Sequence, residues 1–142
     1  MNEQWIPWKP ITHFKDHYGI AQILYDKPKL TIVLYPWEKN IQEVTIIFSA
    51  GVISYSFADD VYALEMPHYQ RYSKEFLSSS NFFKILNSSY IQNLSEQFQT
   101  SENFESYMHF VIGSVDGNID IISSMEPVII ETDISANDRS QE

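Results

Sequence analysis

Short segments in which apolar and polar residues alternate dominate this sequence, and they constrain its fold more than any other feature. Such segments run over 20–25, 30–35, 44–49 and 52–58. A period of two places successive side chains on opposite faces of a β-strand. The connections are short, among them the turn at 26–29 and the pair Ala50-Gly51. The pattern therefore predicts an antiparallel meander, whose second segment, apolar on both faces, is a central strand.

The clearest hairpin is expected near the C-terminus. The segments Met108–Ser114 and Asn118–Ser123 flank the pair Asp116-Gly117. This pair suits a two-residue type I′ loop, in which both positions need positive φ. A last strand is expected over Pro127–Glu131, with its proline at the first position, where a strand tolerates it.

One main helix is expected over 89–98. The run Ser89-Tyr90-Ile91-Gln92 fits a capping box, in which a serine hydroxyl and a glutamine side chain satisfy free backbone amides. Apolar residues then follow at helical spacing, at Ile91, Leu94 and Phe98. The run FFKIL at 82–86 could be a strand or the start of a helix, because five residues do not reveal a period.

The length of 142 residues matches the commonest size of a single domain. We expect one α+β domain over 1–131. Within it, residues 1–18 form an irregular aromatic segment, because Pro7 and Pro10 disfavour a regular helix or a central strand. Residues 132–142 are polar and are predicted to form a disordered tail.

The composition excludes several classes of protein. The chain has no cysteine, which excludes disulfides, zinc–thiolate sites and thiol nucleophiles. Its start lacks the basic and apolar regions of a signal peptide. No apolar run approaches the roughly 18 residues of a transmembrane helix. The sequence thus predicts a cytoplasmic protein without a membrane span.

The charge is distributed unevenly along the chain. Residues 1–84 carry nine acids and eight bases, whereas residues 85–142 carry ten acids and Arg139 alone. The negative electrostatic field of the acidic half repels phosphate backbones, so no nucleic-acid partner is expected. The same field would attract a basic protein partner. The alternative is an acidic surface that serves only solubility.

Two motifs in the C-terminal hairpin suggest chemistry, but the hairpin itself explains both. The run from Asp116 to Asp120 begins like a calcium loop. However, its sixth position would be Ile121 instead of glycine, and its twelfth Pro127 instead of glutamate. The run from Gly113 to Gly117 has its serine in the wrong place for a nucleophile elbow.

Two of the histidines are weak candidates for a metal site, and a third is better explained without a catalytic role. His13 and His17 would share one face of a helix, but a metal site needs a third ligand, and the residues between them lack the glutamate of a metalloprotease motif. His109 is a lone histidine in a strand, and such a residue is more often structural or surface-exposed than catalytic. We therefore predict no catalytic centre, no metal and no cofactor.

The aromatic residues have two interpretations. Three tryptophans and nine tyrosines could form a stacking surface for sugars or bases. A sheet-based core of this size also uses such residues. The core interpretation is favoured. The net negative charge of the chain further disfavours a surface that binds nucleobases.

Two stretches resemble a group of small proteins of Bacillus and related Gram-positive bacteria. The first holds Trp5, Pro7 and Ile11, then Tyr18-Gly19-Ile20 and the strands LTIVL and VTIIFSAGVISY. The second runs from FFKILNSSYIQNLSEQ through MHFVIGSVDGNIDIISSMEP to VIIE. Members of this group occur near polymorphic-toxin genes, and some are described as immunity proteins. The resemblance covers most of 5–131, departs from the group at 100–105, and implies that FFKIL is a strand leading into a capped helix.

The expected fold is α+β. A mostly antiparallel sheet of seven or eight strands curves into an incomplete barrel or sandwich, and the helix packs across one opening. The expected function is a non-enzymatic, intracellular protein-binding module. The resemblance implies an immunity protein that neutralises a cognate basic toxin by occluding its surface.

The interface is expected on an exposed acidic rim around the last hairpin, formed by Asp116, Asp120 and Glu126. Asp120 is expected to point away from the Ile119 and Ile121 face. Two other functions stay open at this point: a small-ligand or lipid-binding barrel, which would need an internal cavity, and a metal-dependent hydrolase that uses His13 and His17. The oligomeric state is also open.

Overall fold

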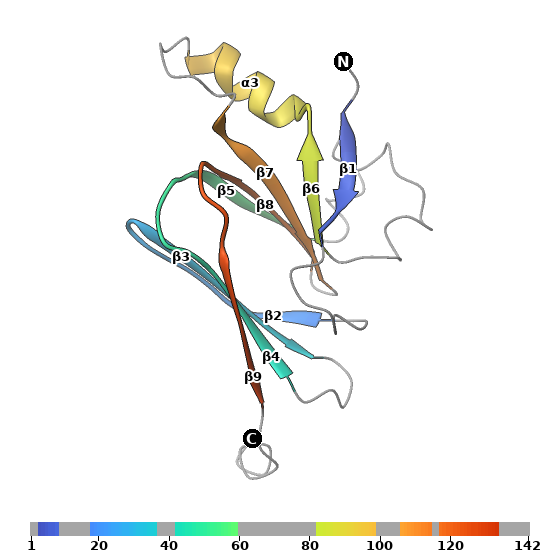
Figure 1. Cartoon of the computed structure of the whole chain (residues 1–142), viewed down its shortest axis with the longest axis vertical. Helices are drawn as coiled ribbons and strands as arrows, with labels where there is room; N and C mark the ends of the chain where they lie inside the picture. The colour runs from blue at the N-terminus through green and yellow to red at the C-terminus, as the bar shows by residue number, and fades with distance from the viewer. Residues whose placement is uncertain are drawn as a thin grey trace.

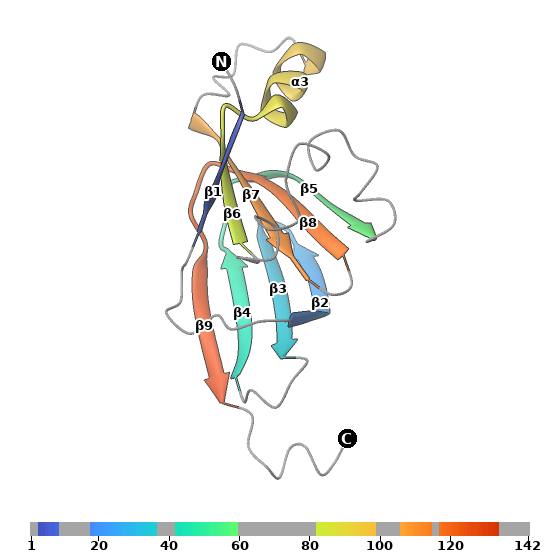
Figure 2. The same ribbon diagram turned by 90° about the vertical axis from the view of Figure 1, so that its right-hand side faces the viewer.

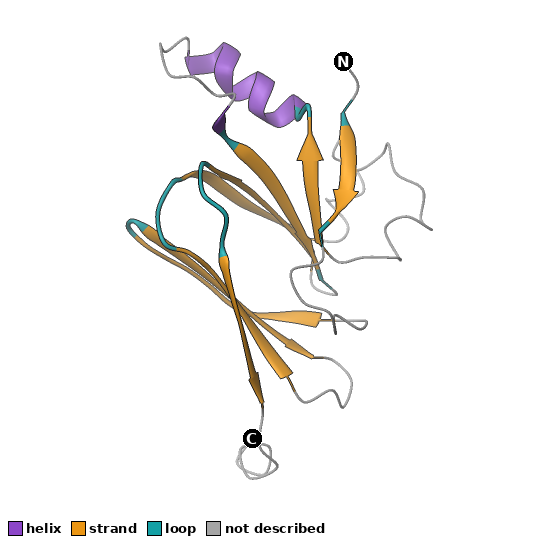
Figure 3. Cartoon of the chain, viewed as in Figure 1, coloured by secondary structure: helices purple, strands orange, loops and turns teal. Residues whose placement is uncertain are grey.

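The structure is a computed structural model of the whole chain, shown in Figure 1, and it describes residues 3–8, 18–36, 42–59, 82–98, 106–114 and 117–133. The described part consists almost entirely of β-strands, which form two separate antiparallel sheets, and it contains one α-helix (Figure 3). In this part of the chain, no helix has the length and apolar character that crossing a membrane requires. The α+β class with a dominant antiparallel sheet is confirmed.

The larger sheet has five strands in the order β1-β6-β7-β8-β5. Their bounds are β1 Gln4–Pro7, β5 Val52–Asp59, β6 Phe82–Leu86, β7 Met108–Gly113 and β8 Gly117–Ser123. The run FFKIL is therefore a strand, as the resemblance implied. The N-terminal segment is not wholly irregular, because β1 pairs with β6 and Pro7 lies at the end of this edge strand.

The smaller sheet has four strands in the order β2-β3-β4-β9. Their bounds are β2 Tyr18–Asp26, β3 Lys29–Pro36, β4 Gln42–Phe48 and β9 Val128–Asp133. The four strands lie side by side in Figure 2, from β9 at one edge to β2 at the other. The meander expected for the first three strands is confirmed, with β3 in a central position. The last strand extends to Asp133, two residues into the predicted tail.

The expected meander is wrong at one connection. Ala50-Gly51 does not close a hairpin, because β4 belongs to the four-stranded sheet and β5 pairs with β8 of the other sheet. Gly51 has a φ of +84°, and a Cβ built on it would lie 2.5 Å from the hydroxyl of Ser124. The glycine thus permits a tight backbone passage from one sheet to the other.

The core lies between the two sheets, so the architecture is an open two-sheet sandwich with nine strands in the described residues. Alternate residues of β3 and β4, such as Ile32 and Ile46, face alternate residues of the larger sheet, such as Phe110 and Ile121. All four are fully buried, and the ring of Phe110 packs edge-on against Phe48 at 5.5 Å between centroids. We call the side of each sheet that faces this core its inner face and the opposite side its outer face.

The outer face of the five-stranded sheet is also buried, partly by the helix α3, Ser89–Phe98. The expected helix bounds are confirmed. The Tyr90 hydroxyl lies 3.0 Å from Ser54 Oγ on β5, and the Tyr90 ring lies 5.4 Å from the ring of His109 on β7. The helix therefore packs on a sheet face and does not close an opening of a barrel.

Candidate functional site

Asp120, one of the three predicted interface acids, is not on the surface. It is 1% exposed on the outer face of the five-stranded sheet, and its Oδ1 lies 2.6 Å from Nε2 of His109. The alternation with Ile119 and Ile121 does place it on the opposite face, as expected, but that face is buried as well. The prediction that Asp120 lies on an exposed rim is therefore wrong.

Of the other two predicted acids, the structure describes only Glu126. Glu126 is exposed in the connection between β8 and β9, and its carboxylate makes an ion pair with Lys84 of β6. Asp116 lies outside the described residues. Glu126 thus lies on the surface and Asp120 lies in the interior. These two described acids do not share a rim.

The turn of the last hairpin differs by one residue from its prediction. Gly113 pairs with Asn118, the backbone N–H of Ser114 donates to the Gly117 carbonyl oxygen at 2.9 Å, and the Ser114 hydroxyl donates to the same oxygen at 2.7 Å. Ser114 and Gly117 are therefore the closing pair of the turn, and Gly117 begins β8. The hairpin explanation of the motifs in this region is confirmed, with this shift of the loop.

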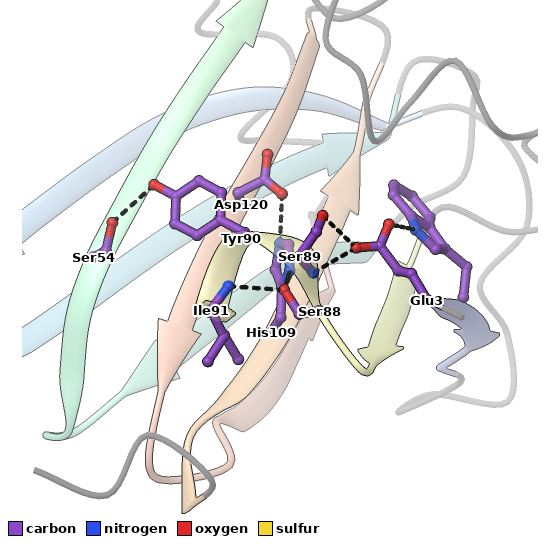
Figure 4. A network of polar contacts seen from close by, with 9 residues as sticks. Glu3, Ser54, Ser88, Ser89, Tyr90, Ile91, His109 and Asp120 are labelled. Carbon is purple, nitrogen blue, oxygen red and sulfur yellow. Dashed lines mark hydrogen bonds and ion pairs between the residues drawn. The ribbon is translucent and has the colours of Figure 1, made fainter. Parts of the chain in front are cut away.

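A chain of polar side chains lies buried beneath the start of α3 (Figure 4). The Oγ of Ser88 lies 2.7 Å from Nδ1 of His109, whose Nε2 lies 2.6 Å from Asp120. With Asp120 ionised, its carboxylate can only accept, so Nε2 carries a proton. The Ser88 hydroxyl can then donate to Nδ1 of a neutral ring, or accept from Nδ1–H of a charged ring. The network can therefore be satisfied in both charge states of His109.

Ser88 has a second role, as the N-cap of the helix. Its Oγ accepts a hydrogen bond from the backbone N–H of Ile91 at 3.2 Å, and its carbonyl oxygen accepts one from Gln92 at 3.1 Å. The N-cap is therefore Ser88 and not Ser89, and the predicted capping box is wrong, because Ile91 stands three residues after Ser88 where the box needs glutamate or glutamine. Serine, histidine and aspartate also occur in this hydrogen-bonded order in hydrolase triads. Here Ser88 is 4% exposed and its oxygen caps the helix, so we assign the network to anchoring α3 on the sheet.

A carboxylate from the start of the chain completes the helix N-terminus. One oxygen of Glu3 accepts hydrogen bonds from the backbone N–H and the hydroxyl of Ser89, both at 2.8 Å. The other oxygen accepts from the indole N–H of Trp5 at 3.1 Å. A negative charge at a helix N-terminus is favourable because the free amides carry partial positive charge. Sequence reasoning missed Glu3 because it lies 86 residues from Ser89.

The described residues contain no group of three or more metal-ligating side chains that could hold an ion. His13 and His17, the predicted alternative metal ligands, lie outside the described residues. The metal-dependent alternative that uses these two histidines therefore stays a prediction.

Large apolar side chains are exposed on the outer face of the four-stranded sheet. Leu24, Tyr35, Val128 and Ile130 are 47%, 40%, 55% and 45% exposed. The register places them on one side of the sheet together with the half-buried side chains of Val33 and Ile47. We call these six residues the outer-face patch.

A second set of exposed apolar side chains lies along β5. Tyr55 and Phe57 are 41% and 48% exposed, and the ring of Tyr55 lies 5.5 Å from the ring of Tyr25 on β2. Both residues belong to the inner face, since they pair with the buried Ile121 and Ile119. They are exposed because β5 is the last strand of its sheet. The prediction that the tryptophans and tyrosines serve the core is wrong for Tyr55 and right for Trp5, which is 5% exposed and packs against Phe83.

Sequence reasoning missed both exposed surfaces. The available signal for the outer-face patch is the apolar character of both faces of residues 30–35, which favours a central strand. The alternation of 52–58 separates an apolar face from a serine face but does not say which of them is exposed. Comparisons of the chain with protein-family models, with curated proteins and with solved structures gave no match.

Proposed function

We propose that the protein is a protein-binding module that holds its partner against the outer-face patch of the four-stranded sheet. The observation that carries this proposal is the exposure of four large apolar side chains of the patch by 40% or more. Contiguous exposed apolar surface of this kind is rare on proteins that act alone and marks binding surfaces.

The composition of the sheet face supports a protein as the occupant. The residues that alternate with the patch residues on this face are largely uncharged, such as Thr31 and Thr45. A sheet face with an apolar centre and neutral polar neighbours resembles the centre of a protein–protein interface, where charged residues are depleted. The packed aromatic core between the sheets, with Phe48 against Phe110, favours this function over a ligand-binding barrel.

The charges at one end of the four-stranded sheet favour a basic partner. Glu43 near the start of β4 lies on the same face as the patch, and the exposed Glu131 near the end of β9 lies in the adjacent row on the opposite face. Neither of them forms an ion pair with another described residue. The whole chain has a formal charge of −10. Such a field speeds the encounter with a basic protein and selects it over acidic ones.

We propose further that the partner is a basic toxin and that the chain is its cytoplasmic immunity protein, which acts by occluding the toxin's surface. This part of the proposal depends on the resemblance described above. The outer-face patch replaces the acidic hairpin as the main contact, since Asp120 is buried. Glu126, in the connection that leads into β9, stays as a candidate contact, and the role of Asp116 stays a prediction.

The test uses as its probe the protein encoded by the neighbouring gene, which this proposal expects to carry a basic toxin domain. Its association with the chain is measured by surface plasmon resonance at low and high salt, and cell survival is measured on co-expression. We expect Ile130→Lys to weaken binding by at least about tenfold, because it puts a charge into the apolar centre of the interface. Phe57→Lys is the matched control, with the same introduced residue at nearly the same exposure, 48% against 45%, on the other sheet.

The proposal makes three demands on these measurements. The wild-type association rate must fall as salt rises, Ile130→Lys must lose binding, and Phe57→Lys must keep it. Loss of binding in the control alone would move the interface away from the outer-face patch. A toxin domain that neither binds nor is neutralised would overturn the immunity function.

A further inference from the structure

The strand β5 is an open edge of the five-stranded sheet. Among the described residues it pairs with β8 on one side and with no strand on the other. Its residues 52–58 contain no charge and no proline, and a charge appears only at Asp59. An edge strand of this kind presents unpaired N–H and C=O groups and is a template for another strand.

The three other edges carry features that oppose strand addition. β1 has four residues and ends at Pro7. β9 carries the acids Glu131 and Asp133 in its second half. β2 has a bulge between Ile20 and Gln22, which interrupts its edge near the middle. On β5 the corresponding bulge lies at the start, between Val52 and Ser54, and leaves the rest of the strand regular.

The side chains of β5 would gain most from an added strand. Tyr55 and Phe57 are 41% and 48% exposed on the inner face, although their partners across β8 are fully buried. An added strand would place its own side chains beside these two rings. Its best residues would be aromatic, because aromatic pairs across neighbouring strands contribute most to sheet stability.

We infer that the occupant of this edge is the β5 strand of a second copy of this chain, so that the protein forms a two-fold dimer with a continuous ten-stranded sheet. The regular part of the strand runs from Ser54 to Ala58, and its midpoint is Ser56. An antiparallel pairing about Ser56 puts Tyr55 of each copy opposite Phe57 of the other. Ser54 then lies opposite Ala58, and Ser56 opposite itself. The pairing over 54–58 contains two aromatic pairs and no pair of like charges.

The charge of the chain determines how this dimer responds to salt. Each copy has a formal charge of −10, so two copies repel each other at a distance. The proposed contact itself is uncharged over 54–58. Added salt screens the repulsion over a few ångströms and leaves the contact intact, so the dimer becomes stronger. Binding of a basic toxin has the opposite dependence.

The experiment measures the mass of the purified full chain by sedimentation and by light scattering over a wide range of concentrations, at low and high salt. We expect the mass to double from 16.6 kDa as concentration rises, at lower concentration when salt is high. Hydrogen exchange at the amides of 54–58 is expected to slow in the dimer relative to the monomer.

Phe57→Lys is expected to weaken the dimer about tenfold, since it removes both aromatic pairs. Ile130→Lys, on an edge strand of the other sheet, is the matched control and is expected to leave the dimer unchanged. If Phe57→Lys lowers the melting temperature, Phe57→Ser removes the ring without adding a charge and makes the same test.

A chain that stays monomeric at all concentrations and salts would overturn the inference, as would a dimer that survives both substitutions of Phe57. A dimer that Ile130→Lys disrupts would place the contact on the four-stranded sheet and would overturn it too. Since toxin binding is assigned to Ile130 and dimerisation to Phe57, either proposal can fail while the other holds.

Discussion

The buried pair of Asp120 and His109 predicts that Asp120→Ala will destabilise the fold strongly. Asp120 is 1% exposed, and its carboxylate lies 2.6 Å from Nε2 of His109. Alanine removes the acceptor and leaves the buried ring without its carboxylate partner. Burial makes this loss costly, because water cannot replace the missing group.

Asparagine separates the hydrogen bond from the charge. Removing one partner of a buried ion pair costs about 3–5 kcal/mol, and leaving a buried donor without its neutral acceptor costs about 1–3 kcal/mol. We therefore expect Asp120→Ala to lose about 3 kcal/mol of unfolding free energy. Asp120→Asn keeps an amide oxygen in reach of Nε2–H, and we expect it to lose about 1 kcal/mol. In a domain of this size the two losses correspond to roughly 6–12 °C and 2–4 °C in melting temperature.

The assay is urea unfolding followed by tryptophan fluorescence, because Trp5 is buried against Phe83 and will change its emission when β1 leaves the sheet. Circular dichroism gives a second probe of the same transition. The reasoning is refuted if Asp120→Ala and Asp120→Asn both unfold within about 0.5 kcal/mol of the wild type, the range of ordinary surface substitutions. Equal and large losses in the two variants would mean that the charge of Asp120 matters and the hydrogen bond does not.

Three further substitutions test the turn and the helix cap by thermal melting. Gly117→Ala should lose about 3 kcal/mol, because φ is +148° and the new Cβ would lie 2.3 Å from the carbonyl oxygen of Ala58. A melting temperature equal to the wild type's would refute this turn geometry. Ser88→Ala should lose about 1–2 kcal/mol, since the hydroxyl serves both the cap and His109; an unchanged melt would refute that double role. Glu3→Gln should lose less, about 0.3–1 kcal/mol, and the loss should shrink in high salt, because only the charge at the helix end is removed. A larger loss than in Ser88→Ala would contradict this ranking.

Much of the secondary structure could be predicted from the sequence, because local periodicity is strong in β3, β4, β7 and α3. The helix bounds agree with those of the structure, and the core faces of β3 and β4 follow the alternation. The assignment of strands to sheets could not be predicted. A two-residue link such as Ala50-Gly51 suits a hairpin and a passage between sheets equally well, and only the distant pairing of β5 with β8 distinguishes them.

The candidate sites were harder to predict, for a related reason. Alternation separates the two faces of a strand but does not say which face is exposed, so Asp120 was assigned to the surface although both faces of β8 are buried. The same ambiguity applies to Tyr55, for which the core interpretation is wrong because it lies on an edge strand. The shift of the cap from Ser89 to Ser88 reflects two adjacent serines that the sequence pattern treats alike.

The order of the strands has a consequence for how the chain is made. The five-stranded sheet takes its first strand, β1, from the start of the chain, and the four-stranded sheet takes its last strand, β9, from near the end. Each sheet therefore contains one edge strand that is distant in sequence from its other strands. During synthesis, β1 has no partner strand until β6 has been made. The antiparallel pair of β3 and β4 lacks its neighbour β9 until residue 133 has left the ribosome. Contacts between distant residues close late and slowly. We therefore expect the five-stranded sheet, whose last strand in the sequence ends at Ser123, to form before the four-stranded sheet, which lacks β9 until later in synthesis.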